Sequence, residues 1–283
     1  MTMNISKKVI ANIIQKRSPQ AHKGTYGHAI IVAGSFGKMG AAVLAAKACL
    51  RSGVGLLTIY VPKCGYTVLQ ATIPEAMVIC DKSKTIISEN INVNDFDVVG
   101  IGCGIGTNEK TAKALRKMIK NIEKPMVIDA DAINIISENK DWLKYIPAES
   151  IFTPHAIEFE RLVGKSSTET EQNNLQKAFS EKYNVYVVLK GHKTHISCPN
   201  GNFYSNTTGN AGMAKAGNGD TLTGILTAFL AQGYTPEHTC MAGVYLHGLA
   251  GDIAVKETGE FSLLASDLVH TLGKAFLETT AKA

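Results

Sequence analysis

The chain has 283 residues, of which 45% are hydrophobic and 19% are charged, a balance typical of a soluble globular protein with a sizeable core. Its formal net charge of +5 is mildly basic, and no Lys/Arg cluster with interleaved aromatic residues occurs. The composition therefore excludes a nucleic-acid partner and favours a small anionic substrate. No apolar run approaches the roughly 18 residues of a membrane span, and residues 1–17 lack the apolar segment of a secretion signal. The six scattered cysteines include no C-x-x-C pair, so we expect a cytoplasmic protein with reduced thiols.

Short apolar segments alternate along the chain with longer amphipathic ones. The first strand candidate, residues 29–33, is wholly apolar, which is the pattern of a sheet covered on both faces. The strand candidates span 29–33, 56–61, 76–80, 97–101, 126–128, 151–153 and 186–190, and a hairpin is expected over 193–205. The helix candidates include 5–17, 41–51, 109–120, 171–183, 235–256 and 266–278.

Repeated strand–helix units predict an α/β protein with a mainly parallel central sheet and helices on both faces. No linker, repeat or low-complexity segment divides the sequence, so residues 1–283 are expected to form a single domain. Ligands of such sheets bind beyond the carboxyl ends of the strands. Glycines and polar residues collect at these ends, at 34–40, 102–106, 129–134, 153–158, 190–194 and 209–220. The sequence thus predicts a ligand crevice along this edge of the sheet.

The stretch from Gly209 to Gly233 is the most unusual part of the chain. Its first half contains four glycines, and its second half has apolar residues at helical spacing from Leu222 to Leu230. Asp220 stands near the expected helix start, where unpaired backbone N–H groups attract anions. One interpretation is that Asp220 only caps the helix. The other is that the glycines let an anionic ligand approach the bare backbone, with Asp220 beside it.

Two further glycine-rich turns, GSFGKMG (34–40) and GCGIG (102–106), follow strands in the first half of the chain. Neither has the G-x-G-x-x-G spacing of a dinucleotide fingerprint, and no G-x-x-x-x-G-K-[ST] motif occurs. These glycines either serve only close packing or contact a second anionic ligand.

The charged residues at the other strand ends also have two interpretations each. Asp129 and Asp131 could bind a metal ion or cap a helix. His155 and Glu158 are three residues apart, so on one helix face they could order a hydrated Mg²⁺ and a phosphate, or simply lie in solvent. Residues 190–194, KGHKT, either bring two cations and a hydroxyl to a ligand or form an exposed basic hairpin.

Six motifs in series carry a resemblance to a known family: GSFGKMGAAVLAA, IGCGIG, VIDADAIN, TPHAIEFERL, VLKGHKT and GNAGMAKAGNGDTLTG. In this order and spacing they resemble the ribokinase-like superfamily and, within it, the ADP/ATP-dependent NAD(P)H-hydrate dehydratases. The similarity extends over nearly the whole chain, from residue 23 to residue 252. Two positions depart from the family pattern. Ile157 stands where the family commonly has glycine, and residues 215–220 are KAGNGD where it has TGGTGD or similar.

The resemblance implies a reaction that repairs damaged cofactor. The substrates would be the S epimers of NADHX and NADPHX, in which the reduced nicotinamide carries a hydroxyl at C6. Asp220 would act as general base on this hydroxyl, whose oxygen attacks the terminal phosphate of ADP or ATP. An unperturbed aspartate has a pKa of about 3.9 and is ionised at neutral pH. Backbone N–H groups of 217–220 would stabilise the transferred group, and phosphate would then leave with AMP or ADP as the other product.

The same resemblance implies two neighbouring subsites and a metal. The hydrated dinucleotide is expected to contact Ala41, Gly104, His155 and Asp220. The residues expected to bind ADP or ATP are Lys190, Gly191, His192, Lys193, Thr194, Asn210, Gly217, Asn218 and Gly219. Mg²⁺ is expected to bridge the nucleotide phosphates, held through water by Glu158.

The family also implies a homo-oligomer, a tetramer, that works with a separate NAD(P)HX epimerase, because the chain is too short to contain the epimerase domain fused to some relatives. Two other functions stay open. A small-molecule kinase of the same superfamily, such as a hydroxyethylthiazole kinase, would keep the phosphate on its product. A non-catalytic nucleotide sensor would bind the nucleotide without turnover.

Overall fold

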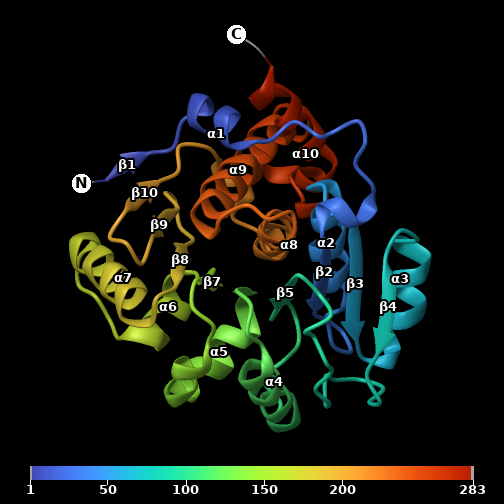
Figure 1. Cartoon of the computed structure of the whole chain (residues 1–283). Helices are drawn as coiled ribbons and strands as arrows, with labels where there is room; N and C mark the ends of the chain where they lie inside the picture. Colours follow the sequence, from blue (N-terminus) through green and yellow to red (C-terminus); the bar gives the residue numbers. More distant parts are fainter. Residues whose placement is uncertain (1, 282–283) are drawn as a thin grey trace.

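The computed structural model describes residues 2–281, and all ten of its strands belong to one sheet. The strand order is β1-β10-β9-β8-β7-β6-β5-β2-β3-β4 (Figure 1). Neighbouring strands are parallel except that β9 is antiparallel to both β8 and β10. The predicted mainly parallel α/β class is therefore confirmed.

The strands are β1 (Met3–Asn4), β2 (His28–Val32), β3 (Leu56–Val61), β4 (Met77–Cys80), β5 (Val98–Ile101), β6 (Met126–Ile128), β7 (Ile151–Phe152), β8 (Tyr186–Leu189), β9 (His195–Ser197) and β10 (Phe203–Ser205). The predicted hairpin is formed by β9 and β10, and Gly201 in its turn has φ +85°, a conformation that favours glycine.

The helices are α1 (Lys7–Ile13), α2 (Met39–Arg51), α3 (Tyr66–Thr72), α4 (Glu109–Asn121), α5 (Ala130–Glu138), α6 (Ala156–Val163), α7 (Glu169–Tyr183), α8 (Asn218–Ala231), α9 (Pro236–Ser262, with a break at Gly259) and α10 (Ala265–Thr280). They lie on both sides of the sheet (Figure 1). In that view α1, α9 and α10 are above the strands, α4, α5 and α6 are below them, and α7 is at the left, beside β8 and β9.

Alternating residues of the central strands pack into separate hydrophobic cores on the two faces of the sheet. In β6, Ile128 packs into the core that includes Ile133 of α5, whereas its neighbour Val127 packs into the core that includes Leu222 and Ile225 of α8. This alternation follows from the two-residue period of a strand. Because both faces are apolar, α8 is held against the middle of the sheet, where its first turn lies beside the strand ends.

Some elements differ from the sequence-based expectation. The first helix was expected over 5–17 but ends at Ile13, where Ile14 takes an extended conformation. Further along this segment, the Arg17 guanidinium lies 4.0 Å from the centroid of the Tyr26 ring. Helix α3 was not predicted at all. Only Leu69 of its seven residues is buried, so it leaves almost no apolar periodicity.

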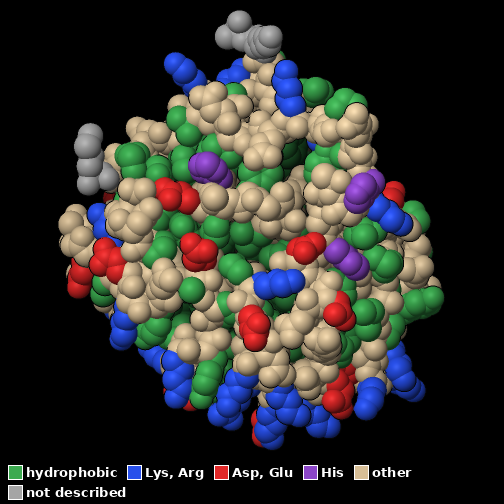
Figure 2. All heavy atoms as spheres, viewed as in Figure 1, with side chains coloured by type: hydrophobic (Ala, Val, Ile, Leu, Met, Phe, Trp, Pro, Cys, Tyr) green, Lys and Arg blue, Asp and Glu red, His purple; other side chains and the backbone are tan. Residues whose placement is uncertain are grey.

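One helix carries a cluster of basic residues. Figure 2 shows Lys and Arg side chains gathered along the lower edge of the molecule, where α4 lies. The basic residues of α4 are Lys110, Lys113, Arg116, Lys117 and Lys120. These side chains form an exposed basic face on α4. Within residues 2–281, no helix combines the length and the apolar character that crossing a bilayer would require.

Candidate functional site

The glycine-rich segment ends in the first turn of α8. Gly217 occupies the position before the helix with φ +95°, and a Cβ there would lie 2.7 Å from Leu44 Cδ1. Helix α8 begins at Asn218, so Asp220 is inside its first turn, and no side chain caps this end by a hydrogen bond. The interpretation of Asp220 as a mere helix cap is therefore wrong. Its carboxylate is available for chemistry beside the helix N-terminus.

A histidine of α9 contacts the first turn of α8 through polar atoms. His247 Nε2 lies 3.0 Å from both the Asn218 carbonyl oxygen and Thr221 Oγ1. Burial lowers the pKa of His247 to about 4, so the ring is neutral at physiological pH. Asn218 Nδ2 donates to the Met213 carbonyl oxygen at 2.6 Å. The Asn218 amide thus joins the start of α8 to the preceding glycine-rich segment. The position of Asn218 in the motif does not reveal this role.

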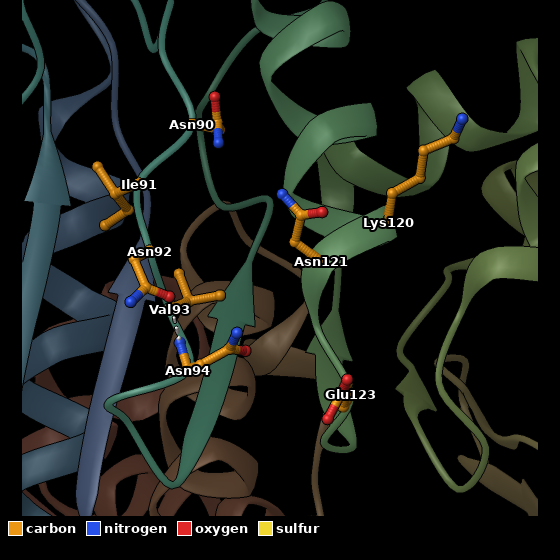
Figure 3. A pocket seen from close by; sticks show the side chains of 8 residues that line it. All are labelled: Asn90, Ile91, Asn92, Val93, Asn94, Lys120, Asn121 and Glu123. Carbon is orange, nitrogen blue, oxygen red and sulfur yellow. Dashed lines mark hydrogen bonds between the residues drawn. The ribbon is translucent and has the colours of Figure 1, made fainter.

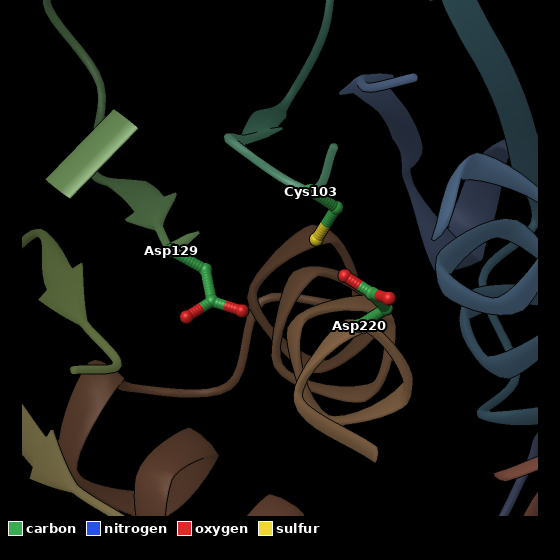
Figure 4. Close-up of side chains that lie close together, drawn as sticks. All are labelled: Cys103, Asp129 and Asp220. Atoms are coloured by element: carbon green, nitrogen blue, oxygen red, sulfur yellow. The ribbon is translucent and has the colours of Figure 1, made fainter. Parts of the chain in front are cut away.

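Three reactive side chains from distant parts of the sequence converge at this point (Figure 4). A carboxylate oxygen each of Asp129 and Asp220 and the Cys103 thiol sulfur lie within 4.8 Å of one another. Cys103 follows β5, Asp129 follows β6 and Asp220 belongs to α8. Because β5 and β6 are adjacent parallel strands, their carboxyl ends meet at one edge, as the sequence predicted.

Burial raises the pKa of Asp220 to about 6; a hydrogen bond with Cys103 opposes this shift, and the negative charge of Asp129 adds to it. The expectation of an ordinary aspartate pKa is thus corrected, because the sequence does not show how far the side chain is removed from water. At neutral pH Asp220 is still mostly ionised, and its affinity for a proton suits a general base. Burial, together with Asp220 and Asp129, raises the pKa of the Cys103 thiol well above its usual range, so the sulfur stays protonated.

Asp129 is fully engaged by neighbouring side chains. Its Oδ1 accepts from Lys190 Nζ at 2.8 Å and its Oδ2 accepts from Thr223 Oγ1 at 2.8 Å. Burial alone would raise the pKa of Asp129, but the Lys190 ammonium and these hydrogen bonds hold it below the ordinary value. Asp131 is also occupied, since its Oδ2 accepts from the Gly106 N–H at 2.7 Å and lies 3.4 Å from Lys38 Nζ. Both carboxylates are therefore already engaged by donors of the protein.

The two glycine-rich turns of the first half lie together. Ser35 Oγ donates to the Gly104 carbonyl oxygen at 2.7 Å, and the Gly34 N–H donates to the Cys103 carbonyl oxygen at 2.8 Å. Gly104 has φ +65°, and a Cβ on it would lie 3.0 Å from Ala41 Cβ. Ala41 and Gly104, two of the residues expected to contact the hydrate, are thus neighbours across this junction.

His155 and Glu158 form the start of α6. The His155 ring Nδ1 accepts from the N–H groups of Ile157 and Glu158, and Glu158 Oε2 accepts from the His155 N–H at 2.8 Å. Helix α6 begins at Ala156, so His155 is the cap rather than part of one helix face. Its side chain is half exposed, whereas that of Glu158 is buried. His155 also pairs with Lys190 in a parallel bridge, which joins the strand ends of β7 and β8.

The remaining predicted nucleotide residues form two groups. Gly191, His192 and Lys193 are exposed beyond β8, while the Lys190 ammonium turns inward to Asp129. Asn210 Nδ2 donates to Asp252 Oδ1 at 2.9 Å, and the Gly209 N–H donates to Asp252 Oδ2 at 2.9 Å. Asp252 on α9 thus fixes the start of the glycine-rich segment. The sequence assigned no site role to Cys103, Thr223, His247 or Asp252, although Cys103 and Thr223 lie within two of the quoted motifs.

Two surface hollows lie elsewhere and contain none of the predicted site residues. One, of about 470 Å³, is lined mainly by asparagines between residues 90–94 and the end of α4 (Figure 3). In Figure 3 these short amides line the walls without a convergent charged group. The other, of about 510 Å³, lies between α1 and α10. The predicted site residues lie at the carboxyl ends of the strands instead.

The strand order and the glycine-rich start of α8 define a ribokinase-like α/β protein. A family model described as NAD(P)H-hydrate dehydratase matches residues 29–274, and the chain belongs to that family.

Individual relatives agree with this assignment. The crystal structure of the ADP/ATP-dependent NAD(P)H-hydrate dehydratase from Bacillus subtilis, co-crystallised with ATP/Mg²⁺, has a TM-score of 0.87 and 28% identity, covering 98% of this chain and 99% of that one. The ADP-dependent (S)-NAD(P)H-hydrate dehydratase of Enterococcus faecalis is 34% identical, covering 89% of this chain and 86% of that protein. The bifunctional NAD(P)H-hydrate repair enzyme Nnr of Thermofilum pendens is 36% identical over 92% of this chain, which spans about half, 51%, of that relative's length.

Proposed function

We propose that the protein dehydrates the S epimers of NADHX and NADPHX to NADH and NADPH, using ADP or ATP as co-substrate. The observation that carries this proposal is Asp220, a buried carboxylate with its pKa raised to about 6 in the first turn of α8. A base poised there can act on a hydroxyl while the helix N-terminus attracts a phosphate. Family membership and the names of the relatives supply the substrate class.

The reaction divides into two steps. Asp220 takes the proton of the C6 hydroxyl, and the hydroxyl oxygen attacks the terminal phosphorus of ADP or ATP, releasing AMP or ADP. The C6–O bond then breaks and inorganic phosphate leaves with the bonding electrons, and loss of a proton from C5 forms the C5=C6 double bond that restores the reduced nicotinamide ring. Backbone N–H groups at residues 217–220 face the phosphoryl group during the first step. Asp220 is the group whose protonation state decides the rate.

The two substrates occupy neighbouring parts of the crevice. Ala41, Gly104 and His155 contact the hydrated dinucleotide, and Asp220 meets its hydroxyl. The nucleotide contacts are Lys190, Gly191, His192, Lys193, Thr194, Asn210, Gly217, Asn218 and Gly219. This division is supported by the contact of the Ala41 and Gly104 positions on one side of Asp220 and by the helix N-terminus on the other.

Mg²⁺ would neutralise charge on the nucleotide phosphates when bound, as in other phosphoryl-transfer enzymes. Glu158 fits a contact with it through water rather than direct ligation, because one carboxylate oxygen already accepts from the His155 N–H. The ATP/Mg²⁺ of the Bacillus subtilis crystal structure supports a role for this ion.

The cellular compartment, the partner enzyme and the oligomeric state are also proposals. All six cysteines are unpaired, which suits a reducing cytoplasm. Because several relatives are bifunctional repair enzymes, we propose that this chain works with a separate NAD(P)HX epimerase. We further propose that it forms a homo-oligomer, a tetramer, of single-domain subunits.

The decisive experiment incubates the protein with NADH hydrate, Mg²⁺ and either ADP or ATP. Regain of absorbance in the reduced-nicotinamide band, with one inorganic phosphate per turnover, is the expected result. A phosphorylated product without free phosphate would show a kinase instead, and nucleotide binding without turnover would show a sensor.

Asp220→Asn is the matched variant for the same assay, since it keeps the size of the side chain but removes the base. We expect its turnover to fall at least ~10²-fold, the lower range for acid–base catalysis, while ADP binding is largely kept. Near-normal turnover would remove Asp220 from the mechanism.

A further inference from the structure

We propose that Asp129 is a positioning residue of this reaction, which holds the Lys190 ammonium against the first turn of α8, where it faces the phosphoryl group in transfer. Asp129 acts through Lys190 and does not itself contact substrate. This inference rests on the proposed function and adds to it a residue outside the predicted substrate and nucleotide sets.

The contacts of Asp129 tie three elements together. One carboxylate oxygen accepts from Lys190 at the end of β8, and the other accepts from Thr223 of α8, both at 2.8 Å. Asp129 itself is only 1% exposed at the end of β6. A buried carboxylate with both oxygens engaged by charged and polar donors forms a rigid anchor. Its removal therefore disturbs the position of Lys190 and α8 together.

The Lys190 ammonium is placed where the two proposed subsites meet. A Cβ on Gly219 would lie 3.1 Å from Lys190 Nζ, so the ammonium contacts the first turn of α8 directly. The Lys190 N–H donates to the Pro154 carbonyl oxygen at 2.9 Å, next to His155. An ammonium held by Asp129 against the first turn of α8 reinforces the helix N-terminus toward an anion. A side chain at position 219 would therefore contact the ammonium closely.

The same pair also sets the charge around Asp220. Besides the Cys103 thiol, the charged groups that act on Asp220 from neighbouring elements are Asp129, Asp131 and Lys190. Asp129 raises the pKa of Asp220 and Lys190 lowers it. The neutral His247 on α9 braces the backbone of the turn and adds no charge. Removal of one partner therefore changes the acidity of the base in a direction that depends on which partner is lost.

The opposite effects of Asp129 and Lys190 on the pKa of Asp220 provide a test. For Asp129→Asn we expect kcat to fall at least ~10-fold because the ammonium loses its anchor. The acid limb of the pH–kcat/KM profile should move to lower pH, because loss of a neighbouring negative charge favours ionisation of Asp220. For Lys190→Gln we expect a similar loss of kcat but a shift of the acid limb to higher pH. The double variant should lose little more kcat than Lys190→Gln alone, because both changes break one unit.

Glu257→Gln is the matched control. It also removes a carboxylate from an ion pair, to Lys274 at 2.6 Å, but on the exposed surface. Its kcat and pH profile should equal those of the wild type. Thermal melting reports whether each variant is folded, and if Asp129→Asn does not fold, the upward shift in Lys190→Gln decides the question.

Acid limbs that stay at the wild-type pH in folded variants, or additive losses of kcat in the double variant, would overturn the inference. These outcomes differ from a failure of the proposed function, in which the wild-type protein itself would release no phosphate from NADH hydrate and ADP or ATP.

Discussion

At Asp220 the surrounding protein changes the chemistry that the side chain alone would have. Burial moves its pKa to about 6, roughly two units above an unperturbed aspartate. In the proposed role of general base, this shift brings the pKa of Asp220 closer to neutral pH and makes its carboxylate a better proton acceptor. It also makes activity sensitive to mild acid, which an ordinary aspartate would not.

This sensitivity can be measured. A base must be ionised to act, so with a pKa of about 6 the active fraction is nearly complete above pH 7 and is lost as pH falls through 6. We expect kcat/KM for NADH hydrate to decline about tenfold per pH unit on the acid side. Initial rates at constant ionic strength, with ADP binding measured at each pH as the control, give the profile. A profile that stays level down to about pH 4.5 would mean that Asp220 has an ordinary pKa or is not the base.

At the scale of elements, α8 has two tasks that depend on different glycines. Gly217 and Gly219 keep side chains away from the helix N-terminus. Gly224, one turn further on, allows the helix to lie against α2, since a Cβ there would be 2.0 Å from the Ala45 carbonyl oxygen. The backbone of α8, which carries the site, is therefore packed directly against the backbone of α2.

Gly219→Val tests the first task. Overpacking by a branched side chain typically costs about 1–3 kcal/mol, so we expect the Kd for ADP to rise at least ~5-fold. Calorimetric titration measures it. Gly273→Val is the control, because a Cβ at Gly273 of α10 would meet nothing within 4 Å. Equal ADP affinity in folded Gly219→Val and wild-type protein would place the phosphates away from this turn.

Gly224→Ala tests the second task. The added methyl group must displace the backbone of Ala45, so we expect the free energy of unfolding to fall by about 1–3 kcal/mol. Urea denaturation measures this change. Gly273→Ala adds the same methyl group to an open helical position and should not destabilise the protein. A Gly224→Ala variant as stable as the wild type would show that α2 and α8 can separate without cost.

At the scale of the whole molecule, the site exists because the sheet brings together ends of strands from both halves of the chain. β2 and β5 supply the turns around Ala41 and Gly104, whereas β7 and β8 supply His155 and residues 190–194. Between these groups lies β6 with Asp129, and α8 packs against β2, β5 and β6. This arrangement would place the two proposed subsites on either side of Asp220.

Ala41→Trp tests that separation. A large side chain beside Gly104 should fill only the dinucleotide subsite, so we expect NADPH, a stand-in for the hydrate, to bind at least ~10-fold more weakly. ADP and ATP affinities should change little. Ala148→Trp, in the exposed loop before β7 at the opposite end of the strands, is the matched control. Loss of ADP or ATP binding with NADPH binding retained would invert the two subsites.

Local patterns in the sequence were enough to predict the fold class and the edge of the sheet that carries the site. Strand candidates such as 56–61 and 126–128 coincide with β3 and β6, because a strand buried on both faces must be apolar throughout. Glycines and polar residues follow these strands because ligands and turns require them there. Asp220 could be singled out for the same reason, since the glycines before it mark a helix start that an anion can approach.

The tertiary structure alone decided what surrounds Asp220. Lys190 and Asp129 are 61 residues apart in sequence, and Thr223 and Asp129 are 94 apart, so no periodicity or spacing connects them. The sequence predicted Lys190 as a nucleotide contact, which stays a prediction, but it gave no sign of the ion pair between Lys190 and Asp129. Burial likewise depends on every element that packs around a side chain, which is why the raised pKa of Asp220 could not be predicted. Local sequence specifies strands, turns and helix starts because their forces act between near neighbours, while pairing and desolvation arise only when distant segments exclude water together.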